Sequence, residues 1–115
     1  MKDDRTYLAH IRECLECVAR FTAAGRAEFM EDRKTRSAVL RELQTLAESC
    51  QRLSPSLNAG HPEVFWQGIA GFRHVLVHDY LGISAARVWE IIENDIPVLR
   101  RAVDAMLSDT GGAGS

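Results

Sequence analysis

Three residues with complementary chemistry lie close together in one segment of the chain: Arg73, His78 and Tyr80. A guanidinium can bind a phosphate through two oxygens, an imidazole can move a proton near neutral pH, and a phenol can donate a hydrogen bond. Together these groups could hold and cleave a phosphodiester. The structural alternative is that they are amphipathic residues at the rim of a core helix, because Phe72 and residues 75–77 beside them are apolar.

The spacing of these residues leaves several arrangements open. Successive helical residues are rotated by about 100°, so Arg73 and His78 would be about 140° apart around an ideal helix. Both could reach one phosphate if the helix unwound near its end, if the Arg73 side chain curled around it, or if two copies lined one cleft in a symmetric dimer. His74 and His78 have the spacing of a two-histidine zinc site, although the sequence offers no evident third ligand.

The size and composition of the chain are those of one soluble globular domain, with 115 residues, 46% of them hydrophobic and 26% charged. Its formal net charge of −2 provides no global positive field, so nucleic-acid binding would depend on a local patch. No apolar run approaches the length of a membrane span, and no signal peptide opens the chain. We therefore expect a cytoplasmic protein that is not associated with a membrane.

The cysteines do not indicate a disulfide framework, because there are three of them without a regular pattern. Cys14 and Cys17 would share one face of a helix, as a redox pair or half of a metal site could. Their segment lacks the strand-turn-helix context of a thioredoxin motif. Small thiols that face the core in a reducing cytosol are the favoured interpretation.

Apolar residues recur with the three-four spacing of amphipathic helices, and no segment has the pattern of a strand. We predict an all-α fold, an antiparallel bundle of four to five helices, over residues 1–107, with a flexible tail over residues 108–115. We expect a first helix from Asp3 or Asp4 to a left-handed cap at Gly25, followed by a short helical turn over residues 26–32 and a second long helix over 33–53. A loop over 54–61 should lead to a third helix, which has Pro62 in its first turn and ends near 78–80. A fourth helix should begin at Ser84 and break or kink at Pro97, with Asp95 as the local cap.

Two further features of the predicted helices concern a possible site. Gly68 and Gly71 are three positions apart on the third helix, where glycine costs helix propensity, so they can mark a close approach of another helix or a ligand. Glu48 lies close to the apolar stripe of the second helix. It is therefore the acidic residue that we expect to face an interface or a site.

The sequence also resembles a known family. The pattern Arg73-x4-His78-x-Tyr80 is similar to the Arg-x4-His-x-Tyr signature of the HEPN superfamily, and specifically of the small HepT-like toxins. The similarity covers about residues 3 to 107 and includes His61-Pro62-Glu63, Ile69-Ala70-Gly71, Val88-Trp89 and Asp95-Ile96-Pro97. In two places the chain departs from the family pattern: His74 replaces a common Asn, and Leu46-Ala47-Glu48-Ser49 replaces a frequent Ile-Gly-Glu-Ala.

The resemblance implies a homodimeric ribonuclease toxin of a type VII-like toxin-antitoxin pair, with no metal or other cofactor. Its partner would be a small nucleotidyltransferase antitoxin, similar to enzymes that transfer AMP to the motif tyrosine, here Tyr80. Arg73 and His78 would then be catalytic, and Tyr80 would position the substrate and accept the modification. Residues adjacent to this site would be His74, Asp79 and Glu48.

The chemistry of RNA is compatible with this implication. RNA carries its own nucleophile, the 2′-hydroxyl, so cleavage needs a base, an acid and charge stabilisation but no metal ion. His78 could transfer the proton, Arg73 could stabilise the charge on the phosphate, and a dimer could supply base and acid from opposite protomers. The alternative is a non-catalytic helical binding subunit of a nucleotidyltransferase complex, in which the same segment docks the enzyme or a nucleotide.

Overall fold

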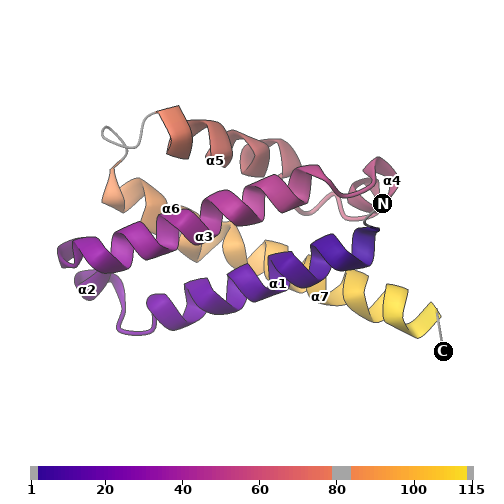
Figure 1. Cartoon of the computed structure of the whole chain (residues 1–115), viewed down its shortest axis with the longest axis horizontal. Coiled ribbons are helices and arrows are strands. Elements are labelled where there is room, and N and C mark those ends of the chain that lie inside the picture. The colour runs from indigo at the N-terminus through magenta and orange to yellow at the C-terminus, as the bar shows by residue number, and fades with distance from the viewer. Residues whose placement is uncertain (1–2, 79–83, 114–115) are drawn as a thin grey trace.

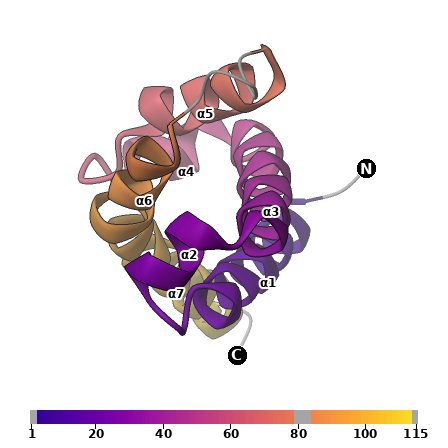
Figure 2. The same ribbon diagram turned by 90° about the vertical axis from the view of Figure 1, so that its left-hand side faces the viewer.

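The computed structural model describes residues 3–78 and 84–113, without the side chains of 73–78 and 110–113. Within these ranges the chain is all-helical, as the sequence predicts, and contains no strand. Its elements are α1 (Asp4–Phe21), α2 (Arg26–Glu31), α3 (Arg33–Gln51), α4 (Pro55–Ala59), α5 (Trp66–His78), α6 (Ala85–Asn94) and α7 (Ile96–Ala113). Helix α3 packs between α1 and α5, and α7 packs against α1 and α6 (Figures 1 and 2).

The core of the bundle consists of apolar side chains from all the long helices. Residues that are at most 1% exposed include Leu8, Ile11, Leu15 and Val18 of α1, Val39, Leu43 and Leu46 of α3, and Leu99, Val103 and Met106 of α7. Burial of each such side chain favours folding by about 1.5–3 kcal/mol. The three-four spacing that the sequence shows is therefore the spacing of residues that face one shared core.

Aspartates begin two of the long helices. The Asp3 carboxylate accepts a hydrogen bond from the Thr6 amide at 3.1 Å, which confirms the predicted cap of α1. The Asp32 carboxylate accepts from the Lys34 amide at 3.0 Å and from the Thr35 hydroxyl at 2.7 Å. The bonds from Thr6 and Lys34 satisfy amides that have no partner within the helix.

The linkers differ from the sequence prediction. Residues 54–61, predicted as a loop, contain α4, and Pro55 is its first residue, where a missing N–H costs no hydrogen bond. Pro62 was expected in the first turn of the third helix, but it lies in a turn and α5 begins only at Trp66. A proline suits both positions, so the residue type alone does not distinguish them.

Gly25 has the positive φ that the sequence predicts, at +95°, but it does not end the first helix. Helix α1 ends at Phe21, and Gly25 is the residue that precedes α2. With ψ at −175°, the backbone there is in a region that glycine alone adopts readily.

The predicted break near Pro97 is confirmed. Helix α6 ends at Asn94 and α7 begins at Ile96, so Pro97 lies in the first turn of a new helix, where it is tolerated. The Asp95 carbonyl accepts from the Leu99 amide at 3.1 Å and so starts α7. Helix α7 continues to Ala113, beyond the predicted domain end at residue 107, and the flexibility of the tail stays a prediction.

All three cysteines are free. Cys14 and Cys50 are buried, and burial raises the pKa of each thiol to about 12. A thiol that stays protonated is a poor nucleophile. The interpretation of core-facing thiols, made for Cys14 and Cys17, therefore holds for Cys14, and Cys50 is buried in the same way. Cys17 is only partly buried, and its sulfur accepts a hydrogen bond from the Arg20 guanidinium at 3.2 Å.

Among the described helices, none has the length and hydrophobicity that crossing a membrane requires.

Candidate active site

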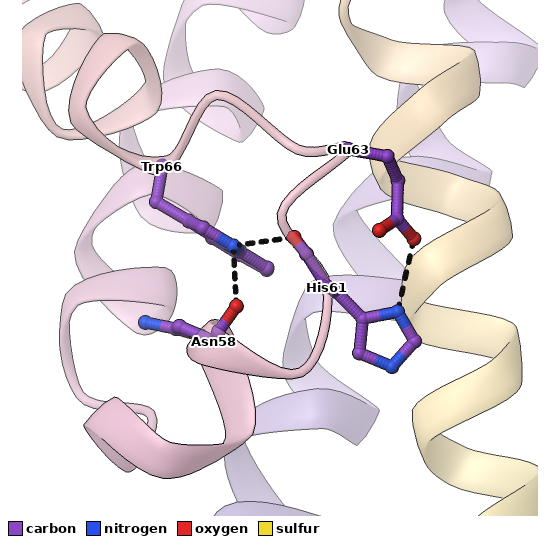
Figure 3. Close-up of polar contacts among 4 residues, drawn as sticks. All are labelled: Asn58, His61, Glu63 and Trp66. Carbon is purple, nitrogen blue, oxygen red and sulfur yellow. Dashed lines mark hydrogen bonds and ion pairs between the residues drawn. The ribbon is translucent and has the colours of Figure 1, made fainter.

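The start of α5, the helix that carries Arg73 and His78, is anchored by Trp66. Its indole N–H donates to the carbonyl oxygens of Asn58 and His61, at 3.0 Å each (Figure 3). His61 Nδ1 also lies 3.0 Å from Glu63 Oε2, and this hydrogen bond lowers the pKa of the Glu63 carboxyl. The linker between α4 and α5 is thereby tied to the first residue of α5, which fixes the direction in which the helix leaves it.

Helix α5 runs back along α3. Ile69 is 2% exposed in the core, while Trp66 and Ala70 line a groove with Cys50 near the end of α3. Further along, Phe72 lies with Leu43, nearer the middle of α3. The last turns of α5 therefore continue toward the N-terminal half of α3 (Figure 1).

The predicted catalytic residues occupy those last turns. The backbone is helical from Arg73 through His74 to His78. The helix is therefore not unwound between Arg73 and His78, and the two positions stay about 140° apart around its axis. The remaining routes are the reach of the Arg73 side chain and a second copy of the helix. Asp79 and Tyr80 lie outside the described residues.

Glu48 lies on a different side of α3 from the residues that contact α5. Its side chain is 50% exposed and is 3.8 Å from the Arg52 guanidinium in an ion pair of adjacent turns. It lines a shallow pocket with Tyr7 and His10 of α1. This pocket is part of the groove between α1 and α3. Whether Glu48 is also adjacent to the motif of Arg73, His78 and Tyr80 stays a prediction.

Among the side chains that the structure describes, no three His, Cys, Asp or Glu residues are grouped so that they could hold a metal ion. His61, which lies in the linker between α4 and α5, is paired with the Glu63 carboxylate.

A cavity that the sequence analysis did not identify lies between α3, α5 and α6. Its volume is about 330 Å³, and its lining includes Phe65, Gly71 and Phe72 beside or within α5, with Arg87 and Asn94 from α6. The spacing of Gly68 and Gly71 was the available signal, since both glycines line this cavity. The α6 residues carried no such signal, because only the packing of α6 against this side of the bundle brings them there.

Comparison with known proteins identifies the family. Residues 11–106 match the family model described as "Ribonuclease HepT-like", which spans the chain from α1 to α7 and includes the motif. The chain belongs to the HepT-like ribonuclease family. The resemblance seen in the sequence is thereby confirmed.

Several relatives align with this HepT-like chain over nearly their whole length. "Putative RNase MJ0127" of Methanocaldococcus jannaschii is 32% identical over 112 residues, 96% of this chain and 93% of the relative. "Putative RNase TTE0752" of Caldanaerobacter subterraneus subsp. tengcongensis is 33% identical over 108 residues, 93% and 96%. "Probable ribonuclease HepT" of Thermococcus cleftensis is 32% identical over 100 residues, 86% and 91%. No solved structure matches the chain significantly.

Proposed function

We propose that this HepT-like protein is a metal-independent endoribonuclease in which Arg73 and His78 act on the scissile phosphate. The observation that supports it is the match to the HepT-like ribonuclease family over residues 11–106, with the residues of the Arg-x4-His-x-Tyr signature intact. Both proposed catalytic residues stand on the last turns of α5, whose start is anchored through Trp66.

In the proposed reaction the RNA 2′-hydroxyl loses its proton to a base and its oxygen attacks the adjacent phosphorus. The bond from phosphorus to the 5′-oxygen breaks, and an acid protonates that oxygen. The products are a 2′,3′-cyclic phosphate and a 5′-hydroxyl. An imidazole suits either proton transfer near neutral pH, and a guanidinium stabilises the charge on the phosphate oxygens.

We place the reaction in a cleft shared by two protomers. Because α5 stays helical from Arg73 to His78, one chain presents the two positions in different directions. A symmetric dimer would bring two copies of this helix end together and supply one imidazole as base and the other as acid. Control would come from a nucleotidyltransferase antitoxin that attaches AMP to Tyr80.

Cleavage of a mixed-sequence RNA in excess EDTA tests the proposal. We expect cyclic-phosphate products, and we expect His78→Ala to lower the rate by about 10²–10⁴-fold while the circular dichroism spectrum is unchanged. His10→Ala is the matched control, because His10 is an exposed histidine in the groove between α1 and α3.

Two outcomes would contradict this proposal. If EDTA abolished cleavage and zinc or magnesium restored it, a metal site at His74 and His78 would replace it. If the wild-type protein did not cleave RNA but bound the nucleotidyltransferase, the chain would be a binding subunit.

A further inference from the structure

The cavity between α3, α5 and α6 is large enough for a small planar ligand. Its volume of about 330 Å³ falls in the range of about 300–1,000 Å³ that is typical of ligand sites. Leu43, Val88 and Ile91, which are core residues, line it together with α5. A smaller cavity of about 70 Å³ adjoins it and shares Phe65 and Phe72. Both cavities therefore lie along the first half of α5.

The two glycines of α5 shape this groove. A Cβ atom built at Gly71 would meet no heavy atom within 4 Å, so the backbone there faces open space. A Cβ atom at Gly68 would lie 2.4 Å from Cδ2 of Phe65. Glycine at position 68 thus lets the Phe65 ring rest against the helix, while the exposed Gly71 leaves free space at the edge of the cavity.

Phe65 is an unusual surface residue. Its side chain is 69% exposed, and among the described residues the only other exposed large hydrophobic side chain is Phe21, at 38%. The ring lines both cavities and lies against Gly68. An aromatic face that lies at the mouth of a cavity and is open to solvent is a platform on which a base of single-stranded RNA can stack.

The polar groups of the cavity suit a base better than a phosphate. Asp95, Glu90 and Asn94 line it together with Arg87, whose guanidinium is paired with Glu90 at 3.8 Å. Two carboxylates against one guanidinium repel an anion. Carboxylates and an amide oxygen accept hydrogen bonds from ring N–H and amino groups, and an amide also donates. Adenine, cytosine and guanine carry such an amino group, and uracil does not.

The cavity is also suitably placed along α5. Gly71 and His78 are seven positions apart, which is two turns along one line of the helix and about 10 Å at 1.5 Å per residue. A short stretch of single-stranded RNA can span this distance. A base in the cavity would therefore belong to a nucleotide close to the proposed scissile phosphate.

From these observations we infer that the cavity between α3, α5 and α6 binds one unpaired, amino-bearing nucleobase of the RNA substrate. The inference rests on the proposed ribonuclease function and adds to it a source of base preference. Phe65 stacks on the base, Asp95, Glu90 and Asn94 contact its polar edge, and the open space over Gly71 admits it.

Binding of uncleavable RNA tests this inference separately from catalysis. The probes are fluorescent 2′-O-methyl oligouridylates, either unsubstituted or with one central A, C or G, and fluorescence anisotropy gives the dissociation constants. We expect the wild type to bind at least one substituted strand about tenfold more tightly than the all-uridine strand. Gly71→Leu should weaken this preference, because Gly71 lines the cavity and a leucine side chain there would narrow its opening.

The variants are chosen so that a change in RNA binding cannot be caused by a loss of folding. Leucine has a higher helix propensity than glycine and would enter empty space, so Gly71→Leu should raise rather than lower the melting temperature. Gln67→Leu is the matched control, because it adds the same side chain to an exposed position on α5 that lines the groove beside Cys50 and Ala70. This variant should bind RNA as the wild type does. Phe65→Ala is a second variant that should weaken binding of the substituted strands by about tenfold.

The outcomes separate this inference from the proposed function. Equal binding of all four strands by the wild type, or no binding of any, would overturn the base site. So would an unchanged preference in both Gly71→Leu and Phe65→Ala, even if RNA is still cleaved. If Gly71→Leu changed only the oligomeric state measured by light scattering, the cavity would be a protein contact instead. Loss of cleavage in His78→Ala bears on the proposed ribonuclease alone.

Discussion

The Asp4 carboxylate binds Ser54 through both of its oxygens. The Ser54 amide donates to Oδ1 at 2.8 Å and the Ser54 hydroxyl donates to Oδ2 at 2.6 Å. These bonds join the first residue of α1 to the residue before α4, 50 positions later in the chain. The linker that leads from α4 to the Trp66 anchor of α5 therefore starts from a fixed point.

Replacement of this carboxylate should destabilise the fold. Asp4→Ala removes two charge-assisted hydrogen bonds from a partly buried site and leaves the Ser54 amide without its partner. We expect the free energy of unfolding to fall by about 2 kcal/mol, measured by urea denaturation. Asp104→Ala, which removes an exposed carboxylate on α7, is the control and should change it by less than about 0.5 kcal/mol. Equal effects of the two substitutions would show that the Ser54 contact contributes little.

The cap of α3 should make stability depend on pH. The Thr35 hydroxyl, and then the Lys34 amide, hold the pKa of Asp32 below its usual 3.8. The ionised form is therefore favoured by folding, and this contribution is present above the unfolded-state pKa and lost as the pH falls below it. Asp32→Asn keeps a neutral oxygen acceptor, so its melting temperature should fall less steeply than that of the wild type between about pH 4 and 2.

A residual slope should persist in Asp32→Asn, because the bond from Thr6 also lowers the pKa of Asp3. The double variant Asp3→Asn with Asp32→Asn should be flatter still. If Asp32→Asn and the wild type lost stability in parallel below pH 4, the acid sensitivity would come from other carboxylates.

The parts of the fold that the sequence predicts correctly are those set by local interactions. The cap at Asp3 and the break at Pro97 depend on a residue and its immediate neighbours, and both were predicted. Pro55 and Pro62 were misplaced, because a proline fits a first helical turn and a loop equally well.

The same distinction between local and long-range interactions applies to the candidate site. Arg73, His78 and Tyr80 are recognisable as a linear pattern, so the sequence alone could identify them. The cavity could not be found in this way, because its lining combines residues that are far apart in the sequence, such as Phe65 before α5 and Asp95 after α6. The exposure of Phe65 likewise contradicts its hydrophobic character, and no periodicity predicts it.

Mixing experiments should reveal whether two protomers share one active site. If each cleft needs an imidazole from both chains, a dimer of one wild-type and one His78→Ala chain is inactive. After subunit exchange at a ratio of one to one, about a quarter of the dimers would be fully wild type. Activity per wild-type chain should then fall by about half, and activity should follow the square of the wild-type fraction.

A linear dependence on the wild-type fraction would show that each chain works alone. Light scattering at micromolar concentration provides the independent check, and a monomer that shows no change on dilution would contradict the shared cleft. His10→Ala mixed with the wild type is the control for nonspecific effects of mixing, since His10 lies in the groove between α1 and α3.

The final prediction concerns the control of the proposed ribonuclease through Tyr80. In the expected modification the phenol oxygen attacks the α-phosphorus of ATP, the bond to pyrophosphate breaks, and the phenol proton is released. The new phosphate would compete with RNA for Arg73, and its negative charge would repel the RNA backbone. Co-expression with the proposed nucleotidyltransferase antitoxin should therefore add one or more AMP units and abolish RNA cleavage.

Intact-mass spectrometry decides this prediction, and the chain offers a matched control because it contains only two tyrosines. Tyr80→Phe keeps the ring, lacks the acceptor oxygen and should stay unmodified. Tyr7→Phe should be modified like the wild type, since Tyr7 lies on α1 in the groove beside Glu48. A fully inhibited preparation that carries no AMP would show that the partner acts by covering the site, and AMP on Tyr80→Phe would move the acceptor to another residue.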